Sequence, residues 1–182
     1  MFRTLTVVPL LALGLSLSAC ADLGQPTVRA DLLDQTGKVT GTATFSPSPI
    51  GTRVSIEVSG LKPGPHGLHI HENPNCNPGP DAQGQTIPFG AAGGHFDPGA
   101  SHNHDGPHAR NDQGHGGDLP MITVGEDGKG RLNFDTQRLK MTGPTGVLGR
   151  SIVIHADADD YQTNPAGNSG GRERCGVFQA IN

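Results

Sequence analysis

Apolar and polar side chains alternate one by one over several short stretches of the chain. This period of two is typical of β-strands with one buried face. The stretch 53–58 is the clearest, because valine and isoleucine occupy one face while arginine, serine and glutamate occupy the other. With turn residues between such stretches, the pattern predicts eight strands, at residues 28–32, 39–45, 53–58, 66–71, 121–124, 131–135, 150–155 and 175–181.

No stretch carries a convincing helical period, and the composition agrees. The 182 residues include 28 Gly and 15 Pro, which are both costly inside helices. Short strands separated by turn signals predict an all-β fold, an eight-stranded antiparallel sandwich or small barrel. The length suits a single domain.

A long segment, 73–120, interrupts the strand pattern. It is rich in Gly, Pro, His, Asn and Asp, and a loop of this length in a compact domain is usually functional or disordered. Six of the nine histidines lie between His66 and His104. This density of metal-ligand side chains favours a functional loop.

The stretch 66–71 has the most distinctive pattern. As a strand it places Leu68 and Ile70 on the core side and His69 and His71 together on the other. Two imidazoles at i and i+2 can bind one metal ion, although a polar strand face can also carry two histidines by chance.

Further ligand-type side chains follow in the loop and at the end of stretch 150–155. A set of six histidines and one aspartate suits two borderline metals such as copper and zinc. Calcium and magnesium prefer oxygen ligands. The candidates lie in three segments: His69–His71; the loop parts Gly94–Pro98, His104–Pro107 and His115–Asp118; and His155.

The N-terminal segment predicts export. Arg3 precedes an apolar run from Leu5 to Leu17 that is too short for a comfortable membrane span, as in a signal peptide over residues 1–19. The ending Leu-Ser-Ala-Cys resembles the lipobox of bacterial lipoproteins. This predicts a lipidated Cys20, a tether at 20–26 and a domain at 27–182. The alternative is an ordinary signal peptide that leaves Cys20 as a free thiol, a liability in an oxidising compartment.

Charge and cysteine content narrow the class further. The chain has 13 basic and 17 acidic residues with no basic block, which argues against nucleic-acid binding. Without residues 1–19, which contain one arginine, the balance is 12 − 17 = −5. Setting Cys20 aside leaves Cys76 and Cys175, one even pair in an exported protein, and hence a predicted disulfide. Its loop of about 100 residues corresponds to roughly 4–5 kcal/mol in the chain-entropy model.

Six segments, in register from about residue 27 to the C-terminus, resemble the signature segments of copper/zinc superoxide dismutases. They are Gly67–His71, Gly94–Pro98, His104–Pro107, His115–Leu119, Gly149–His155 and Gly167–Cys175. The resemblance implies a Greek-key β-sandwich or barrel with long metal-binding loops. It also implies an oxidoreductase that converts superoxide to dioxygen and hydrogen peroxide by cycling Cu(II)/Cu(I), beside a structural zinc.

The resemblance also implies residue roles. Copper would be bound by His69, His71, His95 and His155, and zinc by His95, His104, His115 and Asp118, with His95 as a bridging and proton-carrying ligand. Arg172 would guide and hold superoxide. Asp159 would orient ligands of both metals, here His69 and His104, from behind.

Several neighbouring residues remain alternatives at this stage. His102 and His108 compete with His104 as the zinc ligand. Asp157 and Asp160 compete with Asp159. Arg174 lies near enough in sequence to share the steering task of Arg172, and His66 is expected to be a buried structural histidine because it shares a face with Leu68 and Ile70.

Two rival functions remain. An exported copper or zinc buffer or chaperone on the same fold would be expected to lack His95, the zinc ligands or Arg172, which all have candidates here. A zinc hydrolase needs an open metal position and a general base, and the sequence offers no obvious base. The expected location is periplasmic or otherwise extracytoplasmic, with the protein anchored to a membrane through Cys20. It is expected to be a monomer or a homodimer.

Overall fold

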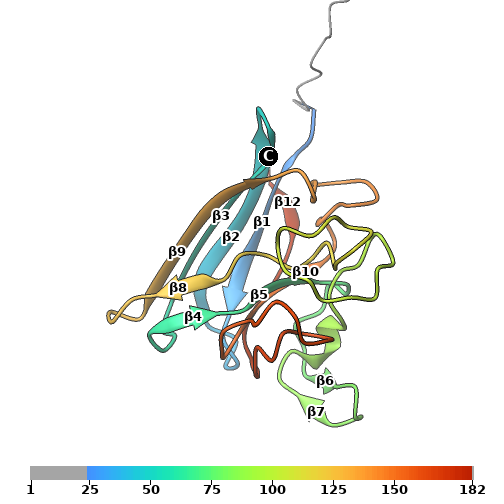
Figure 1. The fold of residues 1–182 in the computed structure, drawn as a ribbon. Coiled ribbons are helices and arrows are strands. Elements are labelled where there is room, and N and C mark those ends of the chain that lie inside the picture. The colour runs from blue at the N-terminus through green and yellow to red at the C-terminus, as the bar shows by residue number, and fades with distance from the viewer. Residues whose placement is uncertain (1–23, 182) are drawn as a thin grey trace, which may run out of the picture.

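The computed structural model describes residues 24–181, so the predicted signal peptide and Cys20 lie outside the described residues. Within this range, ten strands form one antiparallel sheet (Figure 1). They are β1 (Thr27–Leu33), β2 (Val39–Ser48), β3 (Gly51–Ser59), β4 (Gly64–His66), β5 (Leu68–His71), β8 (Ile122–Val124), β9 (Lys129–Thr136), β10 (Ser151–His155), β11 (Arg172–Val177) and β12 (Gln179–Ile181). No helix of the described residues is long and apolar enough to span a membrane.

The sheet closes on itself. Its strand order is β4-β8-β9-β3-β2-β1-β11-β10-β5, with β12 added beside β1. The first and last strands of this path, β4 and β5, are separated in the chain by Gly67 alone, so the two edges of the sheet meet and form a barrel. The predicted all-β antiparallel fold is confirmed.

Two of the eight predicted strands are each divided, and this division gives ten. Stretch 66–71 breaks at Gly67, where a Cβ atom would lie 2.7 Å from the Cβ atom of Ser169. Only glycine allows this close approach. The C-terminal stretch begins earlier than predicted, at Arg172, and breaks at Phe178, whose backbone N–H donates to Arg150 O at 3.0 Å.

The core lies inside the barrel and follows from the alternation. Along β1, burial alternates so that Val28, Ala30 and Leu32 face inward. Phe45 of β2 and Phe178 pack edge to face, with ring centroids 4.9 Å apart. Burying a side chain of this size stabilises the fold by about 1.5–3 kcal/mol, so the inward-facing rows account for much of the closed sheet's stability.

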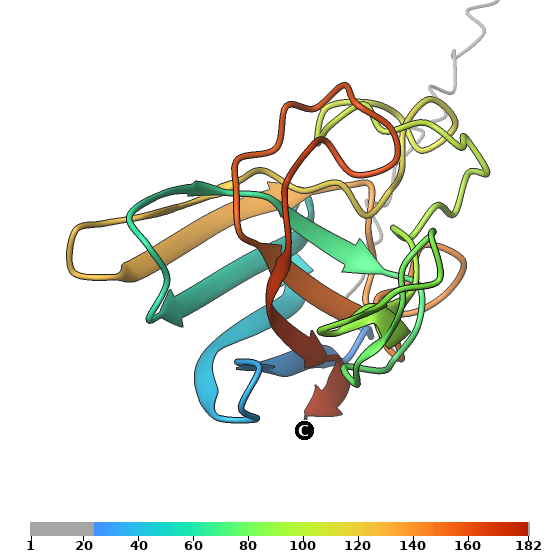
Figure 2. The same cartoon turned by 90° about the horizontal axis from the view of Figure 1, so that it is seen from below.

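The long loop carries short elements that the sequence pattern did not predict: β6 (Gly79–Pro80), β7 (Thr86–Ile87) and the 3-10 helix η1 (Gly90–Ala92). The predicted disulfide is present, with Cys76 and Cys175 Cα atoms 5.7 Å apart, and it fixes this loop to β11. Figure 2 shows the loops 73–120 and 156–171 gathered outside β5 and β10. The site is therefore expected there.

Candidate metal centre

Strand β5 places two histidines where the long loop meets the barrel. His69 and His71 are fully buried. The loop continues the sheet beyond β5, because Phe96 N–H donates to Ile70 O at 2.8 Å and Ile70 N–H donates to Gly117 O at 2.9 Å. This pairing sets the ligand residues of the loop beside those of the strand.

The first cluster joins His69, His71, His95 and His155. One ring nitrogen from each lies within 4.8 Å of those of the others. The ring centroids of His69 and His95 are 3.9 Å apart, and those of His69 and His155 are 4.8 Å apart. The four side chains come from β5, the loop and the end of β10, so the barrel and the loop assemble them jointly.

In this cluster the free nitrogens point inward. The Nδ1 atom of His69 and the Nε2 atoms of His71, His95 and His155 are buried without a hydrogen-bond partner. The opposite nitrogens are engaged: His71 Nδ1 lies 3.0 Å from Gly93 O, and His155 Nδ1 lies 3.2 Å from Gly170 O. A carbonyl can only accept, so the proton of each ring is held on the outer nitrogen and the lone pair is directed into the cluster.

The second cluster is built around the buried carboxylate of Asp118. His95 Nδ1 lies 2.8 Å from its Oδ1 atom. His104 Nδ1 lies 3.1 Å from its Oδ2 atom without hydrogen-bond geometry. His115 Nδ1 lies 3.6 Å from Oδ1. His95 therefore presents Nε2 to the first cluster and Nδ1 to the second.

His115 is the outermost member of this cluster. The compact group of ligand atoms within 4.8 Å of one another consists of His69, His95, His104 and Asp118. The ring centroid of His115 lies 5.4 Å from that of His95 and 5.9 Å from that of His104. Its Nδ1 atom, like Asp118 Oδ2 and His104 Nδ1, is buried and has no hydrogen-bond partner.

The protonation states suit metal binding. Burial lowers the pKa of His69 and His71 well below the ordinary value, and lowers the pKa of His155 to about 3. Burial alone would raise the pKa of Asp118, but its histidine neighbours hold that pKa well below the usual range. Neutral imidazoles and an ionised carboxylate are the forms that bind metal.

His104 differs from the other histidines. Burial opposes its charged form, but the carboxylates of Asp118 and Asp159 outweigh burial and raise the pKa of His104 to about 9. In the metal-free protein it therefore carries a proton at neutral pH. A metal that binds at this position must displace that proton.

These atoms fit the two metals expected from the sequence. Buried polar atoms without partners are rare, because each costs free energy unless something binds it. Four imidazole nitrogens suit copper, and three imidazoles with one carboxylate suit zinc. The donor sets and their unpartnered atoms thus match one copper and one zinc.

Asp159 contacts one histidine of each cluster, on the ring nitrogen that faces away from the proposed metal site. Its Oδ2 atom lies 2.6 Å from His69 Nε2, and its Oδ1 atom lies 2.8 Å from His104 Nε2. The alternatives are engaged elsewhere, since Asp157 forms an ion pair with a surface lysine and Asp160 accepts hydrogen bonds within the turn that follows it. The structure brings Asp159 to His69 and His104, as the resemblance implied.

The other histidines lie apart from the clusters. His102 and His108 are exposed, so of the three candidates the structure brings only His104 to Asp118. The buried position predicted for His66 is confirmed, with its ring nitrogens 2.7 Å from His155 O and 2.9 Å from Lys62 O.

Arg172 lies at the edge of the first cluster, opposite His155 in the β10–β11 register. Its Nη1 and Nη2 atoms donate to Phe89 O at 2.8 Å and Gly93 O at 2.7 Å. Its positive charge contributes to the lowered pKa values of His71 and His155. The guanidinium is thus half-buried and held beside the histidines.

Arg174, the alternative to Arg172, faces another region. Its buried guanidinium donates to Gly60 O at 2.6 Å and to Glu173 O at 2.7 Å. These contacts fix it on the loop before β4. The structure does not bring it to the histidine clusters.

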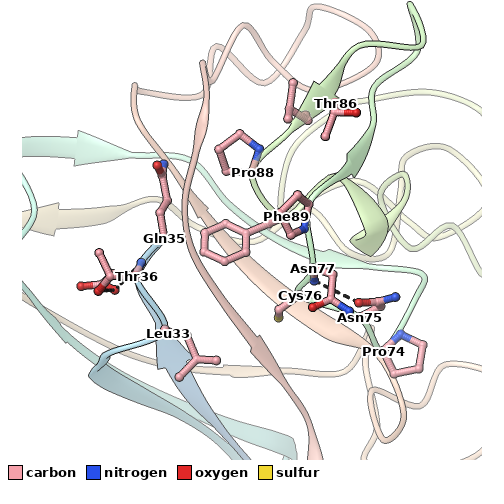
Figure 3. A pocket seen from close by; sticks show the side chains of 14 residues that line it. Leu33, Gln35, Thr36, Pro74, Asn75, Cys76, Asn77, Thr86, Pro88 and Phe89 are labelled. Atoms are coloured by element: carbon pink, nitrogen blue, oxygen red, sulfur yellow. Dashed lines mark hydrogen bonds between the residues drawn. The ribbon is translucent and has the colours of Figure 1, made fainter.

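A cavity of about 620 Å³ lies beside the disulfide rather than at the histidines. Figure 3 shows Leu33, Gln35, Cys76 and Phe89 around it. Gln35 Nε2 donates to Arg172 O at 3.1 Å, so the wall of the cavity supports the backbone of Arg172. None of the proposed metal ligands lines this cavity.

Sequence reasoning missed Arg138, which follows β9. Its guanidinium donates to the backbone carbonyls of Gly106, His115 and Asp118, at 3.2, 2.6 and 3.2 Å, and to Asn111 Oδ1 at 3.2 Å. These hydrogen bonds therefore hold the loop around Asp118 in place. A lone arginine after a strand gives no sequence signal for such contacts.

Comparisons with known proteins agree with this geometry. The family described as copper/zinc superoxide dismutase (SODC) matches residues 39–178. A Cu-Zn superoxide dismutase of Deinococcus radiodurans is 99% identical over 182 residues, which is 100% of both chains.

Two solved structures are also similar. The Cu/Zn superoxide dismutase from Brucella abortus has a TM-score of 0.74 and 36% identity, and the match covers 84% of this chain and 99% of that one. A SOD-like protein from Bacillus subtilis has a TM-score of 0.66 and 32% identity, over 82% of this chain and 96% of that one. The barrel, the two histidine clusters and these matches lead to one conclusion: the chain belongs to the copper/zinc superoxide dismutase family.

Proposed function

We propose that the chain converts superoxide to dioxygen and hydrogen peroxide, with copper held by His69, His71, His95 and His155. Zinc is held by His95, His104, His115 and Asp118. The observation that carries the proposal is the set of buried ligand atoms without partners, because His95 Nε2 belongs to the first cluster of these atoms while His95 Nδ1 lies 2.8 Å from Asp118 of the second. Bound copper and zinc would occupy these two donor sets, and His95 would contribute one ring nitrogen to each.

The reaction balances as two superoxide anions and two protons giving one dioxygen and one hydrogen peroxide. When bound, copper supplies a one-electron redox couple, and zinc supplies a fixed, redox-inert charge. The protein must do the rest: admit a small anion, hold it, and deliver protons.

Arg172 is the residue that holds the anion. A guanidinium remains protonated and offers several donors in a planar fork, which suits a small anion. Its hydrogen bonds to Phe89 O and Gly93 O fix its position beside the histidines. Since the chain is acidic overall, with a net charge of −4, such local positive charge is needed to attract superoxide.

His95 is the residue that handles a proton. Its Nε2 atom faces the first cluster without a partner, while its Nδ1 atom is held by Asp118 at 2.8 Å. A ring held at Nδ1 keeps Nε2 directed into the first cluster. When Nε2 is not engaged by copper, this ring would take up a proton from solvent and pass it to the product peroxide.

The chain is also proposed to act outside the cytoplasm as a lipoprotein anchored through Cys20, with residues 1–19 removed. The disulfide between Cys76 and Cys175 supports export, because such bonds persist in oxidising compartments. Mass spectrometry of the mature chain tests the anchor. An unmodified Cys20 contradicts it.

Substitution of Arg172 tests the anion-binding role. Arg172→Ala is expected to lower the second-order rate by about tenfold or more, equivalent to ~1.4 kcal/mol, with copper and zinc contents unchanged. Arg172→Lys keeps the charge and is expected to retain most of the salt dependence. Arg131→Ala, at a side chain that is 75% exposed, is the matched control. Equal rates in Arg172→Ala and Arg131→Ala would reject the role.

A further inference from the structure

Three large exposed apolar side chains gather at the end of the barrel where the chain enters it. Ile50 is 62% exposed at the turn between β2 and β3, Leu148 is 41% exposed in the loop before β10, and Ile181 is 43% exposed at the end of β12. We call Ile50, Leu148 and Ile181 the tether-end surface. The fourth exposed large apolar residue of the described chain, Val39, is 53% exposed and lies at the other end of β2.

Backbone contacts place these three side chains at one end. Ile181 pairs with Thr27 in the β12–β1 register, so it lies beside the first residue of β1. Leu148 N–H donates to Met141 O at 3.0 Å, and the adjacent Thr142 N–H donates to Gln25 Oε1 at 3.1 Å. In Figure 1 the start of β1, the turn between β2 and β3, and the C-terminus lie together at the top.

The turn that carries Ile50 joins the same end through the register. Val28 of β1 pairs with Phe45 of β2, and β2 then continues to Ser48, past the start of β1. At the base of the turn, Thr52 Oγ1 donates to Leu139 O at 2.7 Å. The turn therefore lies next to the loop that contains Leu148.

The three segments that carry these side chains, 46–51, 141–149 and 179–181, contain no Asp, Glu, Lys or Arg of their own, although charged side chains lie nearby. Arg29 and Asp31 line the groove beside Ile181, and Arg150 donates to Gly146 O at 3.0 Å. The neighbouring Arg53 forms an ion pair with Asp135 at 2.8 Å. In a chain that is acidic overall, these three segments add no acidic side chain that would be repelled by an anionic lipid surface.

The length of chain before β1 decides what covers this end. Four residue steps separate Cys20 from Gly24, the first described residue, and a fully extended chain of this length spans roughly 14 Å. A lipid on Cys20 therefore holds the start of β1 close to the bilayer. Val39 lies at the far end of β2, about 30 Å away along a ten-residue strand.

We propose that the tether-end surface rests on the phospholipid membrane that carries the lipid anchor, with Ile50 and Leu148 inserted at the headgroup level. This inference rests on the proposed lipidation of Cys20. Three side chains are too few to bind a membrane alone, but the anchor makes their contact intramolecular and so greatly raises its effective concentration.

This orientation keeps Arg172, the proposed anion-binding residue, away from the lipid. Arg172 begins β11, and β11 runs five residue steps, about 16 Å, toward Val177 before β12 reaches the tether-end surface. The anion site therefore lies along the side of the barrel, away from the lipid. Superoxide reaches it from the aqueous side of the membrane.

Tryptophan scanning tests the orientation, because the chain contains no Trp. Ile50→Trp and Leu148→Trp report on the tether-end surface, and Val39→Trp is the matched control at the other end. The metal-loaded chain from Cys20 onward is coupled through the Cys20 thiol to a maleimide lipid. The vesicles are phosphatidylcholine with a minor share of phosphatidylglycerol, either plain or brominated in the acyl chains.

The expected result is about twofold or stronger quenching by brominated lipid for Ile50→Trp and Leu148→Trp, with emission shifted to the blue. Val39→Trp is expected to emit equally in both vesicles. Equal quenching of all three variants, or none at Ile50→Trp and Leu148→Trp, would overturn the orientation. Mass spectrometry of natural Cys20 tests the anchor independently, since the chemical coupling does not require natural lipidation.

Discussion

Replacing Arg138 by methionine removes the guanidinium that holds the loop around Asp118 while preserving much of the side-chain volume. Three backbone carbonyls and one side-chain amide lose a charged donor, at distances of 2.6–3.2 Å. Two of these carbonyls belong to His115 and Asp118, which are proposed zinc ligands. The change therefore affects both the fold and the position of the zinc ligands.

The cost of this change follows from the number of carbonyls left without a partner. A partly buried acceptor that loses its donor costs about 1–3 kcal/mol. Taking the lower value for each of three carbonyls, because water can replace some of the bonds, gives about 3 kcal/mol. Zinc affinity is expected to fall by about tenfold or more, which is the usual effect of removing a residue that hydrogen-bonds to a metal ligand.

Urea unfolding of the metal-free protein and chelator competition for zinc measure the two effects. The midpoint for Arg138→Met is expected to fall by about 1–2 M urea, from the free energy above and an ordinary denaturant slope. Arg131→Met, within the β9 strand that precedes Arg138, is the matched control. Its ion pair with Glu57 is exposed and spans 3.4 Å, so its loss should change stability by less than about 1 kcal/mol.

Arg138→Lys separates charge from geometry, because a lysine ammonium cannot contact three carbonyls as a planar fork does. It is expected to recover only part of the zinc affinity. If Arg138→Met and Arg131→Met unfold at the same urea concentration and bind zinc equally well, the role of Arg138 in holding the loop is refuted.

Two further predictions concern the disulfide and pH. The double substitution Cys76→Ser, Cys175→Ser opens a loop with a sequence separation of 99 residues and should cost up to roughly 4–5 kcal/mol in urea unfolding, while an unchanged midpoint would contradict a stabilising bond. In the metal-free protein, His155 has a pKa of about 3 when folded and about 6.5 when unfolded. The unfolded chain therefore takes up a proton at His155 at a higher pH than the folded chain does, and stability falls as pH drops below about 6.5. His104, with a pKa of about 9, binds its proton more tightly when folded, so its contribution is lost as pH rises from about 6.5 to 9. Urea midpoints across this range should therefore peak near pH ~6.5, and a steady rise to pH 9 would contradict the assignment.

The strands were predictable because each buries one face, and apolar and polar residues therefore alternate along its sequence. The breaks at Gly67 and Phe178 were not, since they depend on contacts made across the barrel by Ser169 and Arg150. The two-residue strands β6 and β7 are too short to show a period.

The candidate site divides in the same way. His69 and His71 were predictable from their place on one strand face. The grouping of His95, His104 and His115 around Asp118 followed from the resemblance rather than from any periodicity. Arg138 could not be found from the sequence, because its partners are backbone carbonyls, which leave no trace in residue identity.

The most direct test of the account is the decay of superoxide with the purified chain from Cys20 onward, loaded with copper and zinc, at low and at high salt. The account predicts fast decay that slows as salt rises, because screening weakens the attraction between Arg172 and the anion. No decay, with both metals bound in equal amounts, would contradict the dismutase function and favour a metal buffer or chaperone on the same barrel.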